Sequence, residues 1–245
     1  MVSPRRPVHH NARMKIEGAR ILVTGGATGI GEAIARSAIE QGAKVAIASR
    51  RQDVVEATAE RIGATGFVCD VRDEGAVDTL FTSTLQVLGG LDVLVNNAAV
   101  GHRSPLVELD ADHFRAVWET NVLGAMLCGR AAARHFVDQS AGTIVNVGST
   151  ASLKGYPTGS AYASTKFALT GLTECWRAEL RPHNVRVMQV NPSEVQTPFG
   201  GRDMTKDLNP SKLVAEDVAH LVLAMLALHD RGFVTDATLF ATNPK

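Results

Sequence analysis

Short, apolar, β-branched runs alternate with segments of helical length along most of this chain of 245 residues. The runs are RILVT, KVAIA, TGFVC, DVLVN, GTIVNV, VRVMQV and, more weakly, ATLF. Between them lie stretches with helical periodicity, among them 29–42, 73–88, 110–136, 160–180 and 215–228. Strands that are apolar on both faces are expected where helices cover both sides of a parallel sheet. The alternation therefore predicts a single α/β domain, a doubly wound parallel sheet of about seven strands.

Charge, cysteine spacing and hydropathy exclude several classes of function. Lys and Arg together number 25 and so do Asp and Glu, so no bulk field favours nucleic acid or an anionic membrane. The three cysteines lack metal-ligand spacing, and we expect buried thiols in a reducing compartment and no metal site. No apolar run approaches the roughly 20 residues that a bilayer requires. We expect a cytoplasmic protein with a flexible extension over residues 1–13 and a dinucleotide-binding domain over 14–245.

A glycine-rich turn joins the first predicted strand to the first predicted helix in ILVTGGATGIGEAIA. This strand–turn–helix context is what a dinucleotide-binding fingerprint requires. Gly25 would allow the tight turn, Gly29 would let the backbone approach a pyrophosphate, and Gly31 would let the helix pack closely on the strand. The N–H groups at the helix start attract phosphates, so Thr28 and Ile30 are also expected cofactor contacts. The turn predicts a Rossmann-type dinucleotide site, and an ordinary βα turn is the alternative.

The residues after the second and third strands indicate which dinucleotide is bound. The second strand ends at Ser49, where an NAD enzyme would place a carboxylate against the ribose 2′-hydroxyl, and Arg50 and Arg51 follow. Guanidinium groups can grip a 2′-phosphate, so NADP(H) is favoured over NAD(H), unless the arginines only begin a solvated helix. Asp70 and Val71 follow the third strand. Asp70 is expected either to accept from the adenine amino group or to cap the next helix.

Tyr162 and Lys166 lie four residues apart in SAYASTKFAL, a run with helical spacing. Residues four apart share one helix face. A free phenol has a pKa near ~10, and a neighbouring ammonium would lower it toward the range useful for acid–base catalysis. A surface tyrosine beside a surface lysine is the alternative. Ser149 follows one strand, and Asn96 and Asn97 end another, at the sheet edge where ligands of parallel sheets bind.

These stretches together resemble the short-chain dehydrogenase/reductase family. The matching motifs are TGGATGIG, NNAAVG, ETNVLG, Ser149 with the later Tyr162-Ala-Ser-Thr-Lys166, and NPSEVQT, in family order from Lys15 onward. The glycine spacing G-x-x-x-G-x-G also matches this family rather than the G-x-G-x-x-G of the best-known dehydrogenases. The resemblance implies an NADP(H)-dependent oxidoreductase that interconverts a ketone and a secondary alcohol.

The resemblance also implies a role for each matching residue. Tyr162 would protonate the carbonyl oxygen, Ser149 would polarise that carbonyl, and Lys166 would hold the nicotinamide ribose and lower the tyrosine pKa. Asn121 would support a proton relay through water. The residues expected to line the cofactor are Asn97, Ala98 and Thr197.

The chain departs from the family pattern in places. It has NNAA where the family usually has NNAG, and Ser193 where the family has a glycine whose φ is unrestricted. The ending GFVTDATLFATNPK lacks the glycine-rich tail of many relatives. This ending is similar to that of the 3-oxoacyl-[acyl-carrier-protein] reductase-like branch. Thioesters of 3-oxoacyl groups are therefore the first substrate class expected, with a sugar, a steroid or another secondary alcohol as the alternative.

Three further expectations concern the surroundings of the site. Residues 197–212, TPFGGRDMTKDLNPSK, are expected to form a loop that acts as a lid over the site, with a disordered segment as the alternative, and its part from Pro198 to Lys212 is expected to select the substrate. His102 is expected to be either a substrate contact or a solvated loop residue. Helices that carry the Tyr–Lys pair commonly form subunit interfaces in this family, which implies a homodimer or homotetramer.

A regulatory protein that senses NADP(H) without turnover is the alternative from outside the enzymes. Such proteins commonly lose the catalytic tyrosine or lysine. This chain keeps all four of Asn121, Ser149, Tyr162 and Lys166, which disfavours the sensor.

Overall fold

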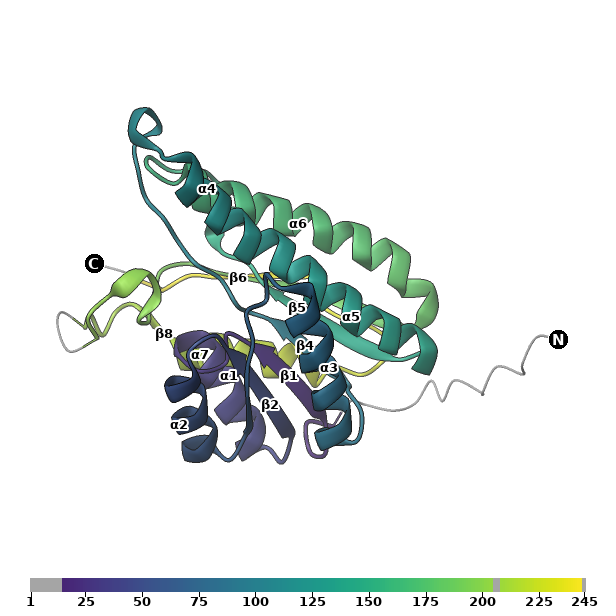
Figure 1. The fold of residues 1–245 in the computed structure, drawn as a ribbon. Helices are drawn as coiled ribbons and strands as arrows, with labels where there is room; N and C mark the ends of the chain where they lie inside the picture. Colours follow the sequence, from purple (N-terminus) through teal and green to yellow (C-terminus); the bar gives the residue numbers. More distant parts are fainter. Residues whose placement is uncertain (1–14, 205–207, 244–245) are drawn as a thin grey trace.

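Seven parallel strands form one sheet in the computed structural model, which describes residues 15–204 and 208–243 (Figure 1). The predicted N-terminal extension lies outside these ranges. The strand order is β3-β2-β1-β4-β5-β6-β9, and every pair is parallel. The doubly wound α/β prediction is confirmed. The strands are β1 Arg20–Thr24, β2 Lys44–Ser49, β3 Thr65–Val68, β4 Val93–Asn96, β5 Gly142–Val147, β6 Val185–Pro192 and β9 Asp236–Leu239.

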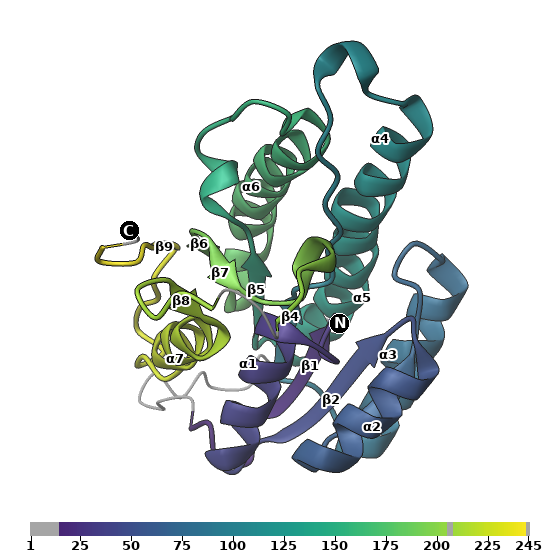
Figure 2. The same ribbon diagram turned by 90° about the vertical axis from the view of Figure 1, so that its left-hand side faces the viewer.

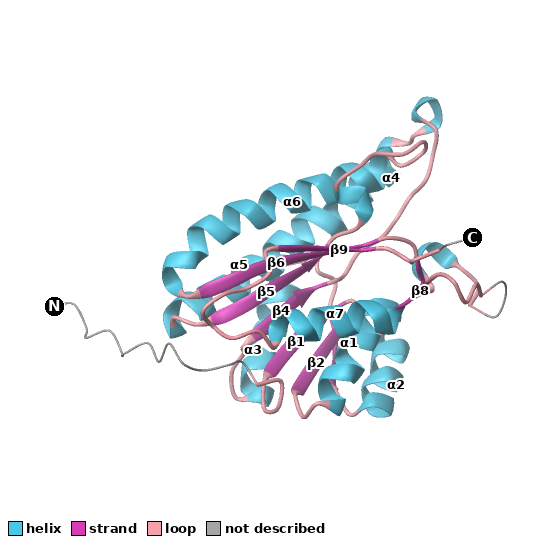
Figure 3. Ribbon diagram, turned by 180° about the vertical axis from the view of Figure 1, so that it is seen from behind, coloured by secondary structure: helices cyan, strands magenta, loops and turns pink. Residues whose placement is uncertain are grey.

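Helices cover both faces of the sheet, and each face has its own apolar core. Figure 2 shows α1 and α7 on one side of the sheet and α5 on the other, and Figure 3 shows the strands between these layers. The inner strands β2, β1, β4, β5 and β6 are buried on both faces and are mostly apolar, whereas the edge strands β3 and β9 are partly exposed. The helices are α1 Gly29–Glu40, α2 Gln52–Ile62, α3 Glu74–Leu88, α4 Ala111–Trp118, α5 Gly124–Gln139, α6 Ser160–Leu180 and α7 Ala215–Leu226.

Local chemistry explains where several of these helices begin and end. The Asp73 side chain accepts from the backbone N–H of Ala76 at 2.8 Å and so caps the start of α3. Gly63 and Gly89 end α2 and α3 in the left-handed conformation that glycine adopts without strain. Ser193 does not adopt a positive φ, so the serine in place of the family glycine causes no backbone strain there.

The stretch predicted to be helical over 110–136 is helical from Ala111 to Gln139. A π-helical turn, Glu119–Leu123, lies between α4 and α5, and such single turns are frequent at functional sites. The helix α2 was not among the stretches named from periodicity. Short 3-10 turns cover Leu106–Glu108, Thr150–Ser152, Arg181–His183 and Phe199–Gly201, and a small second sheet pairs β7 Val195–Gln196 with β8 Leu213–Val214.

The described residues can be searched for metal-ligand groups, buried cysteines and helices long and apolar enough to cross a membrane. No group of His, Cys, Asp and Glu among them could hold a metal ion. Cys69 and Cys128 are buried, but Cys175 is exposed, which corrects the expectation that all three are buried. In the same ranges, no helix combines the length and hydropathy that crossing a membrane requires.

Candidate active site

The glycine turn between β1 and α1 is packed so closely that side chains cannot enter it. A Cβ on Gly25, whose φ is +62°, would lie 2.8 Å from the Cα of Ala98. A Cβ on Gly31 would lie 2.5 Å from Asn97 Nδ2 and closer still to the Gly25 carbonyl. These distances are below van der Waals contact. The turn therefore presents backbone, without side chains, at the start of α1.

The start of α1 also meets the loop that follows β6. Gly29 has a φ of +58°, and a Cβ there would lie 3.2 Å from the Cβ of Thr197. The Thr28 side chain makes no capping hydrogen bond, so it leaves the first N–H groups of α1 to other acceptors. Ile30 packs against the apolar core beneath. A phosphate fits this backbone cradle, because the cradle combines helix N–H groups with an absence of Cβ atoms.

Asn97 holds the turn to the end of β4. Its side-chain Nδ2 donates to the carbonyls of Thr24 and Gly25, both at 3.0 Å. The backbone N–H groups of Asn97 and Ala98 both donate to Thr24 Oγ1. The side-chain amide of Asn97 thus holds the turn in place by hydrogen bonds. The backbones of Asn97 and Ala98 lie at the carboxyl edge of the sheet.

Charged side chains gather where β2 and β3 end. Arg50 and Arg51 follow the half-buried Ser49 and are both exposed, as the solvated-helix alternative also allows. Arg50 is near enough to Asp70 to contribute to lowering its pKa, although the largest lowering cause is the hydrogen bond from Arg72. Arg72 Nη2 donates to Asp70 Oδ2 at 2.6 Å.

The structure contradicts one of the two interpretations of Asp70, which were a contact to the adenine amino group and a cap of the next helix. Asp73, and not Asp70, caps α3, so the capping interpretation of Asp70 was wrong. Val71, next in the chain, is buried against Gly124 at the start of α5. Sequence reasoning missed Arg72, and the signal available was an arginine two residues after an aspartate in a turn.

Tyr162 and Lys166 lie on the first turns of α6, opposite the end of β5. Lys166 Nζ donates to the carbonyl of Val147, the last residue of β5, at 2.8 Å. The same nitrogen lies 5.6 Å from the centre of the Tyr162 ring. Ser149 follows two residues after Val147, and its Oγ accepts from the N–H of Ala151 at 3.1 Å. The fold therefore brings Ser149, Tyr162 and Lys166 together.

The pKa of Tyr162 moves in the direction opposite to the expectation. Burial raises the pKa of this phenol to about 12, and a hydrogen bond with Ser149 opposes that rise only in part. Burial also lowers the pKa of Lys166 to about 8. Lys166 is not among the causes that lower the pKa of Tyr162; its ammonium donates to Val147 and lies 5.6 Å from the centre of the Tyr162 ring. The Tyr162 hydroxyl is therefore a protonated donor at neutral pH.

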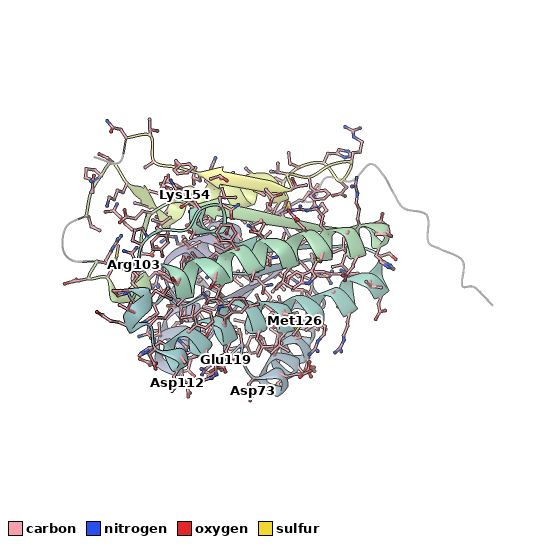
Figure 4. All side chains as sticks on the ribbon, turned by 90° about the horizontal axis from the view of Figure 1, so that it is seen from above. Asp73, Arg103, Asp112, Glu119, Met126 and Lys154 are labelled. Carbon is pink, nitrogen blue, oxygen red and sulfur yellow. The ribbon has the colours of Figure 1, made fainter. Side chains whose placement is uncertain are left out.

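Asn121 lies in the π-helical turn and is buried. Its Oδ1 accepts from the backbone N–H of Val100 at 2.8 Å, and its Nδ2 donates to the Val100 carbonyl at 2.9 Å. The same Nδ2 donates to Thr165 Oγ1 on α6 at 3.0 Å. Asn121 thus connects the loop after β4 to Thr165 on α6, which is the residue before Lys166. Glu119, which begins this turn, lies on the same side of the molecule as Asp73 (Figure 4).

An aromatic side chain from the loop after β6 lies against Tyr162. The Phe199 ring centre is 5.6 Å from that of Tyr162. A Cβ on Gly101 would lie 3.0 Å from the Phe199 ring and 3.9 Å from that of Tyr162. Phe199 and Gly101 were not named as site residues. The available signal for Phe199 was that it is the only aromatic residue of the predicted loop.

Ion pairs and stacking hold the surrounding loops. Glu194, which precedes the predicted loop, pairs with Arg202 inside the loop at 2.7 Å and with Lys212 at its end at 2.9 Å; residues 205–207 lie outside the described ranges. The His102 ring stacks on His113 with 4.3 Å between centres. His102 is therefore packed against α4 rather than freely solvated.

Comparison with known proteins agrees with this arrangement. The chain matches the short chain dehydrogenase family model over residues 19–208. It is 36% identical over 196 residues to 2,5-dichloro-2,5-cyclohexadiene-1,4-diol dehydrogenase of Sphingobium indicum, with 78% of each chain covered.

Two solved structures are similar along almost their whole length. One is a short chain dehydrogenase from Burkholderia cenocepacia in complex with NADP, with a TM-score of 0.83, 30% identity, and coverage of 93% of this chain and 98% of that one. The other is 3-ketoacyl-(acyl-carrier-protein) reductase from Brucella melitensis complexed with NADH, with a TM-score of 0.85, 27% identity, and coverage of 94% and 100%. The chain belongs to the short-chain dehydrogenase/reductase family and is an oxidoreductase that acts on alcohol or ketone groups.

Proposed function

We propose that the protein is an NADP(H)-dependent enzyme that interconverts a ketone and a secondary alcohol. The observation that carries this proposal is the convergence of Ser149, Tyr162 and Lys166 at the end of β5, beside a glycine turn that leaves backbone free for a pyrophosphate. The nicotinamide, when bound, supplies or accepts the hydride. The protein supplies orientation and a proton.

The role of each side chain follows from its protonation state and its neighbours. Tyr162, whose pKa is about 12, keeps its proton at neutral pH and donates it to the carbonyl oxygen during reduction. Ser149 donates a second hydrogen bond to the same oxygen as negative charge builds on it. Lys166 holds the nicotinamide ribose, and its lowered pKa lets it pass protons near pH 8. Asn121, bonded to Thr165, supports the turn of α6 before Lys166.

The charges at the end of β2 support NADP(H) over NAD(H). Ser49 occupies the position where a carboxylate would repel a 2′-phosphate, and Arg50 and Arg51 are both exposed beside it. The relatives support both cofactors, because one similar structure holds NADP and another holds NADH. The preference therefore rests on these three residues. The other proposed contacts are Gly25, Thr28, Gly29, Ile30, Gly31, Asp70, Val71, Asn97, Ala98 and Thr197.

A 3-oxoacyl thioester is the first substrate class that we propose. The chain's similarity to a 3-ketoacyl-(acyl-carrier-protein) reductase supports this class. A cyclic secondary alcohol is the second candidate, because Phe199 lies across the ring of Tyr162 and a diol dehydrogenase of a six-membered ring is 36% identical to this chain.

We also propose a dimer or tetramer built through α6, by analogy with the family. Phe167, on this helix, is 47% exposed, and Leu123, in the π turn, is 39% exposed. Single exposed apolar residues are common on monomers, so the analogy and not these two residues carries the proposal.

The test is a panel of 3-oxoacyl thioesters, cyclic ketones, sugars and steroids, followed by the absorbance of NADPH with NADH in parallel. We expect NADPH oxidation with at least one ketone. Tight binding of NADPH without oxidation by any panel member would favour the regulatory sensor. Faster turnover with NADH than with NADPH would contradict the cofactor assignment.

A further inference from the structure

A buried amide on β6 is bonded to three side chains behind the catalytic residues. Gln189 is completely buried. Its Oε1 accepts from Thr173 Oγ1 at 2.9 Å, and its Nε2 donates at 2.8 Å to both Thr170 Oγ1 and Asn191 Oδ1. A side-chain amide has two N–H donors. Both donors of Gln189 are therefore used, and each bond leads toward a different part of the site.

The first bond leads to the lysine. Thr170 Oγ1, which accepts from Gln189, donates in turn to the backbone carbonyl of Lys166 at 3.2 Å. The ammonium of Lys166 donates to Val147 on β5. The turn of α6 that carries Lys166 is therefore held from β6 through Thr170 and from β5 through Val147.

The second bond leads to the serine. Asn191 Oδ1 lies so close to Gly148 that a Cβ on that glycine would overlap it. The same Cβ would lie 2.9 Å from Ser152 Oγ, which accepts from the backbone N–H of Ser149 at 3.2 Å. The Gln189 amide thus orients the Asn191 side chain against the residue that precedes Ser149.

The third bond returns to the strand between them. Thr173 Oγ1 lies 2.9 Å from Gln189 Oε1 and 2.7 Å from the Leu169 carbonyl, so these two acceptors share its one proton, and it accepts from Asn146 Nδ2 at 2.8 Å. Asn146 is on β5 and is also completely buried. Apolar packing is not directional, whereas hydrogen bonds of buried amides fix both distance and orientation. The three bonds consequently define how α6 lies against β5 and β6.

We propose that Gln189 is a positioning residue that places Lys166 and Ser149 relative to each other. It does not touch the reacting atoms. It acts through Thr170 on the turn of Lys166 and through Asn191 on the end of β5. The inference rests on the proposed function of Lys166 and Ser149, and it adds a residue 23 positions beyond the lysine that no motif contains.

The first test compares Gln189→Met with Thr143→Val. Methionine keeps the length of glutamine and removes its hydrogen bonds. Thr143 is equally buried on β5 and accepts from Arg186 Nε at 3.1 Å, so Thr143→Val also removes a buried hydrogen bond, but on another part of the sheet. We expect Gln189→Met to lower kcat roughly 10- to 100-fold, because small displacements of catalytic groups cost rates of this size. Thr143→Val should retain kcat within about twofold.

Stability must be measured in both variants at the assay temperature. If Gln189→Met loses activity only in proportion to its unfolded fraction, or keeps kcat within about twofold of the wild type, the positioning role is overturned. A kcat loss in folded Gln189→Met that folded Thr143→Val does not share supports it.

The second test uses pH to restore the missing donor. In Gln189→Glu, a protonated carboxyl keeps the acceptor for Thr173 and offers one O–H donor, whereas the carboxylate offers none. Burial raises the pKa of a carboxyl, so the variant should be most active at low pH and lose kcat as pH rises through that pKa. The wild type has no titrating group at this position. A pH profile of folded Gln189→Glu that matches the wild type would contradict the proposal.

Direct binding of NADPH separates this proposal from the proposed function. If the wild type binds NADPH but reduces no ketone, the proposed function fails. The positioning role can still be tested by comparing the dissociation constants of NADPH for the two variants. Gln189→Met should then bind NADPH several-fold more weakly than Thr143→Val does, because a displaced Lys166 no longer meets the nicotinamide ribose. Equal binding by the two variants would overturn the positioning role.

Discussion

The proposed cofactor side and the proposed catalytic side of the site are built from opposite kinds of residues. On the cofactor side, Gly25 and Gly31 matter because they have no side chain, and the charged groups, such as Arg50, are exposed. On the catalytic side, Asn121 and Lys166 are polar and almost completely buried. One side offers backbone and solvated charge, and the other offers buried side chains held by hydrogen bonds.

This difference shows where each side is sensitive. A cradle of backbone fails when a side chain is added, because a Cβ meets backbone that cannot move away. A buried polar site fails when a side chain is removed, because its partners remain without hydrogen bonds. Substitutions on the two sides should therefore differ in which property changes first.

The largest effect should follow removal of one oxygen atom on the catalytic side. Tyr162→Phe removes the proton donor, and general acid catalysis contributes about 10²- to 10⁴-fold, so kcat should fall by that factor. The dissociation constant of NADPH, measured by fluorescence titration, should stay within about twofold of the wild type. Turnover that survives in Tyr162→Phe would remove Tyr162 from the acid role.

Addition of one carbon on the cofactor side should act on stability instead. In Gly31→Ala, the new Cβ meets the Gly25 carbonyl and Asn97 Nδ2, and overpacking at rigid positions costs about 3 kcal/mol. Urea unfolding should show this loss together with weaker NADPH binding. Gly232→Ala is the control, because no atom lies within 4 Å of its Cβ and its φ is not positive. It should change stability by less than about 0.5 kcal/mol; similar losses in both variants would contradict the packing argument.

Lys166 should give stability a particular dependence on pH. Its pKa is about 8 in the folded protein, whereas an unfolded lysine titrates near ~10.4. Between these values the unfolded state binds more protons, so the free energy of unfolding should rise by about 2 kcal/mol from pH 8 to pH 10. Lys166→Met should lack this rise.

Urea midpoints at three pH values in this window measure the slope. Tyr162, whose pKa is raised, contributes the opposite sign only above about pH 10. Lys44→Met, a change at an exposed residue at the start of β2, should keep the wild-type slope. If Lys166→Met kept the wild-type slope of stability against pH, the rise would not come from a lowered pKa of Lys166.

The smallest effect should follow loss of an exposed charge on the cofactor side. Arg50→Ala should weaken NADPH about tenfold, which is about 1.4 kcal/mol, and leave NADH nearly unchanged, because only NADPH carries the 2′-phosphate. Arg61→Ala, at the other end of α2, should change neither. Equal losses for both cofactors in Arg50→Ala would defeat the assignment.

Local patterns in the sequence predicted most of the fold and the core of the site. The seven strands were each found from a short apolar run, and the glycine turn and the Tyr–Lys pair are contiguous motifs whose geometry is local. Interactions between distant segments were not predictable in this way. A π turn at Asn121 replaces part of the regular α-helix that periodicity predicts, and the Asn121 side chain bonds to Val100 and to Thr165, which lie 21 and 44 residues away in the chain.

The sequence by itself determined the doubly wound parallel sheet, the position of the glycine turn and the helical spacing of Tyr162 and Lys166, because each depends on short patterns along the chain. Only the tertiary structure decided the protonation of Tyr162 and Lys166 and the contacts of Gln189 and Phe199. Burial and hydrogen bonding set those properties, and both arise from residues far apart in the chain that meet only after folding.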